Sequence, residues 1–569
     1  MSKRRGSNRP RPMRRVPESS PLPPAAAAAP STNWTPSTGR LARCTQADPF
    51  AIRLGDRPLR DYLIEIGERW VVDLEVALRA MDDVWVTLLP PTDRGRPPYH
   101  PRILVGLVLY GMLRGQCSLR QLEGLAARDL GAWFLCAGLR PDHSTLGNFV
   151  DVHAEQLSDD FFVGVTRKLA HALRLKVGDV AIDGTITEAA ASALRGLRKE
   201  SAHQRRVAAE THAAEAPEDP ERQRKADAAR EVEAAIDARI EARKAQYLAT
   251  ASVAVSPSDL EAVFQPRKDG AFRPAWVPSI LAHESGLILG QHVEATSESA
   301  AILPLLGQHG RILDAAPTCA LMDAKYHCLS VIEPLVMGGV EALCPALSAK
   351  NAATPLEARK TFDKHLFVFQ PDADQYVCPQ GQPLLPFTSQ TDQAGRRYTR
   401  YRSTSCAGCA ERARCTESAT GRMVKRYEGD ALKEAIVAKL RTPEGKAQYK
   451  RRAAMVEPPF GVLREQQGLR RFHRRGRRRV AAEFALHVTA YNLRKGLRQW
   501  RSSALRRTFR ATSPKGRRGG RSTAVRSERA LEARGAPTIP TSPINRRPLT
   551  VGVWLGLLTA PRSYRGMGR

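Results

Sequence analysis

The sequence predicts an α/β protein in which a mixed sheet, flanked by helices, follows an N-terminal helical domain. Three observations lead to this fold class. Residues 46–175 carry apolar side chains at helical spacing. Short apolar runs bounded by turn residues, at 177–185 and 320–327, indicate buried strands. Two further strand signals, at 276–281 and 286–293, are separated by a turn that suits a hairpin.

Composition divides the chain further. The 569 residues are enough for more than one domain with a sizeable core. We predict disordered basic tails at 1–45 and 501–569. Between them we predict a helical domain at 46–175, which we expect to bind DNA, and an α/β core in two parts, at 176–359 and 426–500. A charged helical insertion at 194–250 lies within the first part of the core, and a cysteine-rich subdomain at 360–425 separates the two parts.

Three stretches place a carboxylate at the end of a core element. Asp183 ends the first apolar run and Asp323 ends the second. Glu457 stands before two prolines and an apolar periodicity, so we expect it at the start of a helix, where proline is tolerated. Carboxylates that converge from two strands and a helix can hold two ions of magnesium or manganese, which prefer oxygen ligands. Two such ions suit phosphoryl transfer, although spacing alone does not bring the three acids together.

The net charge of +31 indicates a polyanionic partner. Nucleic acid is the commonest such partner, and an anionic membrane surface is the competing one. No run of 18 apolar residues exists, so we expect no membrane span. The basic N-terminus lacks the apolar stretch of a signal peptide. With ten mostly scattered cysteines, this pattern predicts a protein of the reducing cytosol.

The cysteine-rich subdomain contains a candidate zinc site. Cys406 and Cys409 have the two-residue gap that lets two thiolates reach one zinc ion. Cys378 and Cys415 would complete a set of four. The alternative is a small β subdomain with free or redox-labile thiols, because the interval between Cys378 and Cys406 is long for a compact knuckle.

A dense basic segment begins at residue 449. Its arginines exceed what a solvated helix face usually carries and indicate contacts to phosphate. The competing interpretation is that they only keep the helix soluble. We predict phosphate contacts for Arg470, Arg471, Arg474 and Arg475.

With these stretches in view, the chain resembles the DDE transposases of bacterial insertion sequences, and among them the eleven-eighty-two-like subgroup. The likeness covers most of residues 95–498. The stretches that carry it are His100-Pro101, Leu109-Tyr110-Gly111, Ser118-Leu119-Arg120-Gln121-Leu122-Glu123, Pro141-Asp142-His143-Ser144-Thr145-Leu146, Ile182-Asp183-Gly184-Thr185, Met322-Asp323-Ala324-Lys325-Tyr326-His327, Val456-Glu457-Pro458-Pro459-Phe460-Gly461 and Tyr491-Asn492-Leu493-Arg494-Lys495.

The resemblance implies an RNase H-like catalytic core in which Asp183, Asp323 and Glu457 form a catalytic, metal-binding triad for two Mg²⁺ or Mn²⁺ ions. It also implies the helical N-terminal domain and a subdomain inserted before the glutamate helix, which the cysteine-rich segment resembles.

Family members carry a Tyr, an Arg and a Lys that hold DNA at the cut site. Tyr449 and Arg452 match the first two, and Arg464 stands where Lys is usual. Arginine binds phosphate well but does not act as a compact point charge. Lys325 stands where relatives more often have Gly.

The implied function is that of a transposase that binds the terminal inverted repeats of its element, cleaves them and joins them to target DNA. We expect it to act on double-stranded DNA as a homodimer or larger assembly, in the bacterial cytoplasm at the nucleoid. Two alternatives stay open at this point. One is a stand-alone nuclease with the same core, and the other is a catalytically decayed transposase that acts as a DNA-binding repressor.

Overall fold

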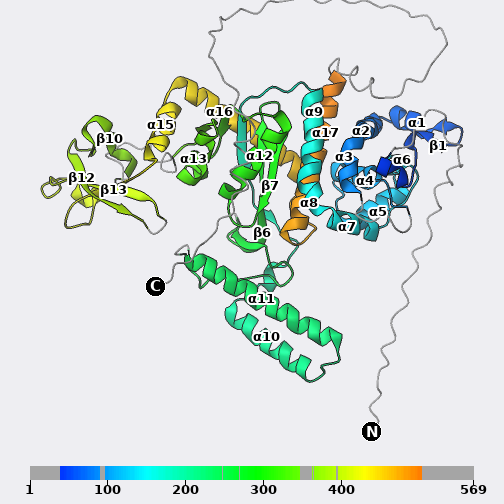
Figure 1. Cartoon of the computed structure of the whole chain (residues 1–569), viewed down its shortest axis with the longest axis horizontal. Helices are drawn as coiled ribbons and strands as arrows, with labels where there is room; N and C mark the ends of the chain where they lie inside the picture. Colours follow the sequence, from blue (N-terminus) through cyan, green and yellow to red (C-terminus); the bar gives the residue numbers. More distant parts are fainter. Residues whose placement is uncertain are drawn as a thin grey trace, which may run out of the picture. The chain divides into compact units, whose positions relative to one another are not determined.

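The computed structural model describes residues 39–89, 97–245, 248–267, 269–346, 362, 364–392 and 395–502 (Figure 1). Most of the tails predicted at 1–45 and 501–569 lies outside these residues. Where the tails are described, Gly39–Arg43 forms the 3₁₀ helix η1, and the last helix ends at Ser502. The chain forms two compact units, one of residues up to 111 together with 118–147, and one of 112–117 together with the chain from 148.

The first unit is built from short helices, with one small antiparallel pair of strands at its edge. Asp142 caps the last of these helices, because its Oδ1 accepts a hydrogen bond from the Thr145 amide at 2.6 Å. Ser118 and Gln121 form a capping box on an earlier helix. The elements are η2 (Pro49–Ala51), β1 (Arg53–Leu54), β2 (Arg57–Pro58), α1 (Leu59–Glu65), α2 (Arg69–Arg79), α3 (Asp82–Trp85), η3 (Val86–Leu88), α4 (Pro101–Leu113), α5 (Leu119–Arg128), α6 (Leu130–Leu135) and α7 (His143–Val152). The last residues of α4 and of α7 belong to the second unit.

The helical region that we expected to continue to residue 175 is divided between the two units. Its last elements belong to the second unit. They are α8 (Ala154–Gln156), the π-type turn η4 (Leu157–Phe161) and α9 (Phe162–Ala172). Helix α9 buries Phe162, Val163 and Ala170 in the core of that unit.

A mixed sheet forms the centre of the second unit. Within the described residues it has seven strands, of which five follow the order β7-β6-β3-β8-β9, while β4 and β5 also pair with β6. The pairs β3–β6 and β6–β7 are antiparallel, and β3–β8 and β8–β9 are parallel. The strands are β3 (Val180–Gly184), β4 (Thr187–Glu188), β5 (Val263–Pro266), β6 (Phe272–His283), β7 (Ile288–Glu294), β8 (Cys319–Leu321) and β9 (Glu341–Leu343).

The parallel register of β3 and β8 brings two of the predicted acids to one edge of the sheet. Ala181 pairs with Leu321, and each of the two aspartates lies two residues further along its chain, at Asp183 and Asp323. Parallel neighbouring strands end at the same edge. The apolar parts of both strands are fully buried, so the sheet fixes the backbone from which both carboxylates project.

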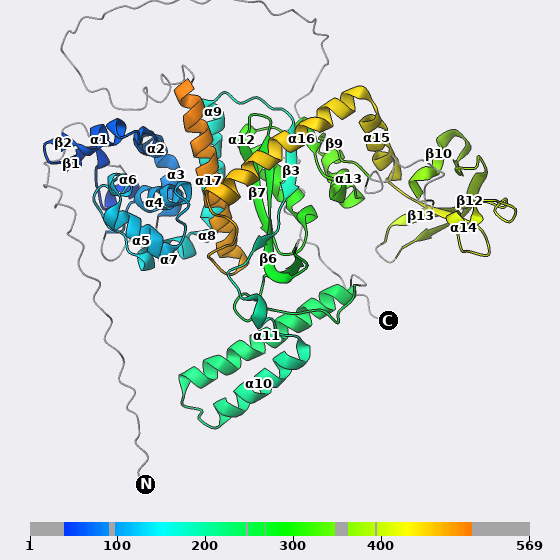
Figure 2. The ribbon, with the colours of Figure 1, turned by 180° about the vertical axis from the view of Figure 1, so that it is seen from behind.

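Helices pack around this sheet (Figure 2). Helices α12 (Ile302–Leu313) and α17 (Arg477–Ser502) contact β7 and α9, whereas α16 (Pro443–Gly461) contacts β3 and β6. The buried amide of Asn492 on α17 pairs with both backbone groups of Ile288, accepting from its N–H at 2.9 Å and donating to its carbonyl at 2.8 Å. Helices α13 (Leu329–Met337) and α15 (Asp430–Arg441) lie near β9.

The expectation that a helix begins at Glu457 is wrong. Helix α16 begins at Pro443, where Thr442 accepts a hydrogen bond from the Gly445 amide at 3.0 Å. Glu457 therefore lies near the end of a 19-residue helix, and the two prolines after it occupy the last turn instead of the first. The chain then continues as a π-type turn, Val462–Gln466. The strong capping signal at Thr442 and Pro443 outweighs the two prolines as a marker of the helix start.

Two insertions interrupt the sheet. The charged segment forms the helical hairpin of α10 (Lys199–Ala214) and α11 (Pro220–Ala245), in green in Figure 1. The cysteine-rich segment forms an antiparallel sheet, which has five strands within the described residues. These strands are β10 (Val368–Gln370), β11 (Gln375–Val377), β12 (Pro383–Thr391), β13 (Arg397–Arg402) and β14 (Met423–Tyr427), with the short helix α14 (Arg412–Cys415) before the last.

None of the described helices combines the length and the apolar character that a membrane span needs.

Candidate metal centre

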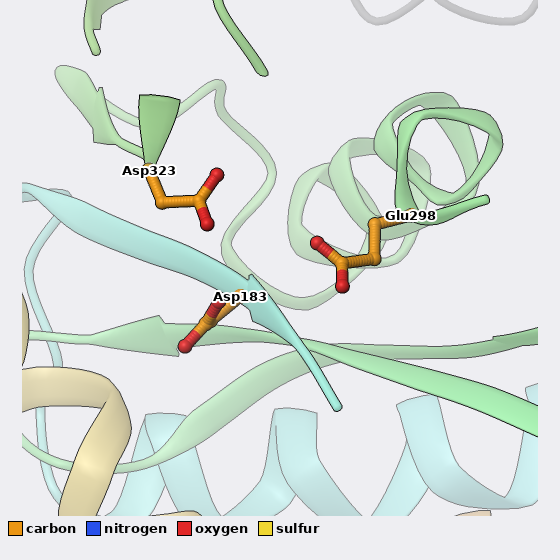
Figure 3. Close-up of side chains that lie close together, drawn as sticks. All are labelled: Asp183, Glu298 and Asp323. Carbon is orange, nitrogen blue, oxygen red and sulfur yellow. The ribbon is translucent and has the colours of Figure 1, made fainter. Parts of the chain in front are cut away.

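Three carboxyl groups converge at the edge of the sheet where β3 and β8 end (Figure 3). They belong to Asp183, Asp323 and Glu298, and their ligand oxygens lie within 4.8 Å of one another. Glu298 comes from η6 (Glu298–Ala301), the turn that connects β7 to α12. Among the residues that the structure describes, this is the one group of three or more acidic, histidine or cysteine side chains with the spacing of metal ligands.

Two cations partly balance this negative charge. Nη2 of Arg452 lies 2.9 Å from Oδ1 of Asp183, and Nζ of Lys325 lies 3.6 Å from Oε1 of Glu298. Lys325 also donates its backbone N–H to Oδ1 of Asp323 at 2.8 Å. Because the lysine side chain is 69% exposed, its charge is well screened. The cluster therefore retains negative charge that a bound cation could neutralise.

Burial raises the pKa of two side chains at this site. The pKa of Asp183 is raised to about 6, mainly by desolvation; Arg452 lowers it, and the nearby carboxylates of Glu298 and Asp323 raise it. Burial also raises the pKa of the Tyr326 hydroxyl, which faces the same three acids. That hydroxyl and Oε2 of Glu298 are both buried, and an interaction with the Glu298 side chain contributes to the raised pKa of Tyr326. Buried oxygens beside crowded carboxylates are groups that an oxygen-binding cation would stabilise.

Gly184 makes room for Glu298. A Cβ atom at this position would lie 2.5 Å from Cγ and 2.8 Å from Cδ of Glu298, and 2.9 Å from Oγ of Ser279. These distances are shorter than real side chains allow. The glycine that follows Asp183 thus has a function besides closing the strand, because it lets the glutamate side chain lie directly against β3.

The donor set fits a divalent cation. All three side chains offer hard oxygen ligands at short mutual distance, which suits Mg²⁺ or Mn²⁺ better than a metal that prefers sulfur or nitrogen. Asp183, Asp323 and Glu298 are the residues that would hold it.

The structure brings three further predicted residues to this cluster. Arg452 binds Asp183 directly. Tyr449 is half-buried one helical turn earlier on α16, and the electrostatic influence of Asp323 and Asp183 reaches its hydroxyl. Arg464 donates a hydrogen bond to Oγ1 of Thr185, two residues after Asp183. The cationic and aromatic side chains that we predicted for the cut site therefore surround the two aspartates.

Glu457 does not belong to the cluster. Its side chain is exposed on α16. In an α-helix, Val456 lies one turn after Arg452 and shares its face, and Val456 is fully buried. Glu457 is one residue further and points about 140° around the helix axis from Arg452. Its place as the third ligand stays a prediction.

Glu298 is the residue that the sequence did not reveal. It follows Ser297, which caps its turn by accepting the Ser299 amide at 3.2 Å. An acid directly after a serine cap is common at helix starts for reasons of local stability alone. No apolar strand leads directly into it, so the pattern that identified Asp183 and Asp323 is absent. The nearest signal is Gly184, whose missing side chain is explained only once Glu298 is in place.

The basic segment is partly engaged within the protein. Arg471 donates hydrogen bonds to the carbonyls of Ala189 and Ala191, and Arg475 donates to that of Ala190. These bonds hold the chain after β4 against the basic segment. If Arg471 and Arg475 also contact DNA, the phosphates would compete with these carbonyls for the N–H groups of the two arginines.

The other two predicted arginines differ in exposure. Arg470 is largely exposed and paired with Glu465. Arg474 is mostly buried, with Nη1 lying 3.7 Å from Asp151 Oδ1. The buried carboxylate of Glu483 accepts the backbone N–H groups of His473 and Arg474 at 3.0 Å each, which fixes the course of the segment.

The four predicted cysteines line one small cavity of the inserted sheet. None forms a disulfide. Backbone N–H groups point at two of the sulfurs, that of Gln382 at Cys378 Sγ (3.3 Å) and that of Arg422 at Cys406 Sγ (3.5 Å). Hydrogen-bond donors of this kind commonly surround the sulfurs of zinc sites, whereas burial raises the pKa of the Cys415 thiol. In contrast to the three acids, the sulfurs do not have the spacing of metal ligands in this structure.

Clustered carboxylates at the ends of parallel strands can hold divalent ions of the kind that phosphoryl transfer uses. Two comparisons with protein families specify the class of protein. A model described as a transposase DDE domain matches residues 377–497, and one described as a transposase domain (DUF772) matches residues 60–151. The first match contains Glu457 but neither Asp183 nor Asp323. Together these matches indicate a DDE transposase of the insertion-sequence type. No curated protein matches the chain.

Replacing Gly184 by Ala should impair metal binding through Glu298. The new methyl group would displace the glutamate side chain from β3, whereas the strand itself tolerates alanine. We expect Mn²⁺ affinity of the DNA-free protein to fall about tenfold, in line with the loss that disturbed ligand positions commonly cause. Gly310→Ala is the control, since nothing lies within 4 Å of that Cβ. Equal Mn²⁺ affinity in titrations of the two variants would contradict this role of Gly184.

Proposed function

We propose that the protein is an active transposase that binds the ends of its insertion sequence, cleaves DNA there and transfers the cut strand to target DNA. The observation that carries the proposal is the convergence of Asp183 and Asp323 at the ends of two parallel core strands, beside Arg452 and Tyr449. The strand order β7-β6-β3-β8-β9, with its antiparallel and parallel halves, supports the RNase H-like core that the resemblance implies.

In this proposal each residue of the site has a separate task. Asp183 and Asp323 hold divalent ions, which activate the attacking oxygen and stabilise the leaving oxygen when bound. Arg452, Tyr449 and Arg464 bind the DNA backbone and hold the scissile phosphate in line. Positioning of this kind supplies much of the rate in phosphoryl transfer. The wider basic surface supplies most of the affinity, because phosphate contacts release counterions.

Glu298 and Glu457 have different roles in the proposal. Glu298 completes the cluster in the DNA-free protein. Glu457 joins when α16 changes its register. One π-type turn between Arg452 and Glu457 would put these residues on one face, since π-helices align residues five apart. Pro458 and Pro459 lack the N–H groups that would bond to the fourth residue before each, so fewer hydrogen bonds resist such a change.

Asp183→Ala should abolish cleavage of a terminal-repeat duplex in Mg²⁺ and leave DNA affinity nearly unchanged. Cleavage requires the ions, whereas affinity comes from arginine and lysine contacts. Glu465→Ala removes a nearby exposed acid that pairs with Arg470 and should cleave normally. Cleavage by Asp183→Ala at the parental rate would overturn the proposal. Products joined to a second DNA separate the transposase from a stand-alone nuclease, and inactivity of the parental protein would favour a decayed repressor.

The two glutamates are separated by two measurements. Glu298→Gln should weaken Mn²⁺ binding to the DNA-free protein about tenfold or more, because it removes a ligand charge from the cluster. Glu457→Gln should leave Mn²⁺ binding unchanged and still reduce cleavage at least 100-fold. Misplacing a catalytic group by only about 1 Å can cost that much, and this change removes the charge altogether. If Glu457→Gln cleaved normally, the third acid of the reaction would be Glu298 alone.

We also propose that Cys378, Cys406, Cys409 and Cys415 bind one structural zinc ion. Their common cavity and the amides that point at two of the sulfurs support this. Four thiolates complete a closed tetrahedral site, and binding would draw the sulfurs together.

Protein purified without chelator should contain about one zinc per chain, because a site of four thiolates holds one ion. Cys409→Ser should lower this content and make the inserted sheet more sensitive to protease, since zinc binding at such a site contributes to folding. Cys328→Ser serves as the control, as this thiol lies outside the cavity. Absence of zinc from freshly purified protein would leave the thiols as ordinary free cysteines.

A further inference from the structure

One face of the inserted sheet is not used by its own small core. Side chains alternate across a strand, and Tyr401 of β13 and Val424 of β14 point into the core with Phe362, Phe367 and Leu384. The opposite face of the three paired strands, here called the outer face, is formed by Leu385, Phe387, Gln390, Tyr398, Arg400, Arg402, Met423, Lys425 and Tyr427.

The outer face is cationic. Arg400 pairs in register with Lys425, and Arg402 lies two residues along the same strand. The face contains no aspartate or glutamate, and none of these three cations forms an ion pair with a carboxylate among the residues that the structure describes. This differs from Arg397 at the start of the strand, whose Nη1 lies 3.6 Å from the Glu428 carboxylate.

Aromatic rings lie between these cations. Nζ of Lys425 lies 4.7 Å and Cζ of Arg400 5.6 Å from the ring centroid of Tyr398. Cζ of Arg402 lies 4.1 Å from that of Phe387. Rings of this kind hold the cations extended along the sheet by cation–π attraction. The charges are therefore preorganised without being neutralised.

Phe387 is presented to solvent by an irregularity in the strand. The register of β12 against β13 shifts between Pro386 and Thr388, which leaves Phe387 as the extra residue of a bulge. Its ring is 51% exposed, and the neighbouring Leu385 is 54% exposed. A bulge that turns a phenylalanine toward solvent does not improve the packing of the core.

We infer that the outer face of the inserted sheet binds single-stranded DNA, with Phe387 stacking on a base and Arg400, Arg402 and Lys425 contacting phosphates. Unbalanced cations identify a polyanion. An intact duplex offers phosphates but no free base face, whereas an unpaired strand offers both. The inference rests on the proposed function for its choice of DNA, and it adds a second DNA-binding surface that recognises the opened strand beside the cut.

The test measures binding of the full-length protein to a single-stranded oligonucleotide and to its blunt duplex, in EDTA over a range of salt concentrations. One variant combines Arg400→Gln, Arg402→Gln and Lys425→Gln. The matched control removes the same charge from the helical hairpin as Arg205→Gln, Arg224→Gln and Lys225→Gln, all at exposed positions. Phe387→Ala tests stacking alone, and Lys425→Gln alone tests the charge of an exposed side chain. Thermal unfolding is followed for each.

We expect the triple variant to reduce the salt slope for the single strand by about 2, at about 0.7 per lost contact, and the single Lys425→Gln to reduce it by about 0.7. Phe387→Ala should weaken single-strand binding about tenfold while duplex binding changes little. Slopes equal to those of the control variant would overturn the inference, as would equal losses for single strand and duplex in Phe387→Ala. Because no cleavage is measured, an inactive parental enzyme would contradict the proposed function and leave this result unaffected.

Discussion

Repulsion among three closely spaced carboxylates is the constraint on which the rest of the site depends. Asp183, Asp323 and Glu298 lie within 4.8 Å of one another, and their charges interact in a half-buried environment where water screens them poorly. A flexible scaffold would relieve this repulsion by moving apart. The sheet prevents it, because β3 and β8 are fully buried and paired in register. Burial is the main cause of the raised pKa of Asp183, and the neighbouring carboxylates add to it.

Repulsion among the three carboxylates also explains why a cationic side chain lies against them. Arg452 lies against Asp183, which keeps one negative charge compensated. Other arginines of the basic segment are held elsewhere, since Arg471 and Arg475 donate to backbone carbonyls after β4. The density of arginine in the sequence is thus a poor guide to DNA contact, and the more useful criterion is whether a cation has a partner within the protein. By that criterion the outer face of the inserted sheet is a stronger candidate for DNA contact than Arg471 and Arg475, which bind backbone carbonyls.

Sequence reasoning succeeded where a local pattern determines the structure. The apolar strands before Asp183 and Asp323, the hairpin between them and the helical character of the N-terminal region all follow from short-range periodicity. It failed where a feature depends on contacts distant in sequence. Glu298 reaches the site only because the turn before α12 packs against Gly184, and its local pattern resembles ordinary capping. The prolines after Glu457 predict a helix start that lies too late in the chain, because the cap at Thr442 determines where α16 begins.

Helix α16 connects these observations. It carries Tyr449, Arg452 and Glu457, so the proposed π-type turn between Arg452 and Glu457 would bring the acid to the face of the phosphate ligand. In the present structure Arg452 occupies the carboxylate that a divalent ion would need, and Glu457 points away. If Arg452 moved toward a DNA phosphate, the Asp183 carboxylate would become available to a divalent ion. This would happen when DNA is bound, which is when Glu457 would be required as a ligand. Under the proposed function, such coupling would keep the DNA-free protein from binding ions in a cleaving arrangement, because the site would be completed only when DNA draws Arg452 away. The prolines in the last turn of α16 reduce the number of hydrogen bonds that oppose this motion, which gives two otherwise unfavourable helix residues a physical reason to be where they are.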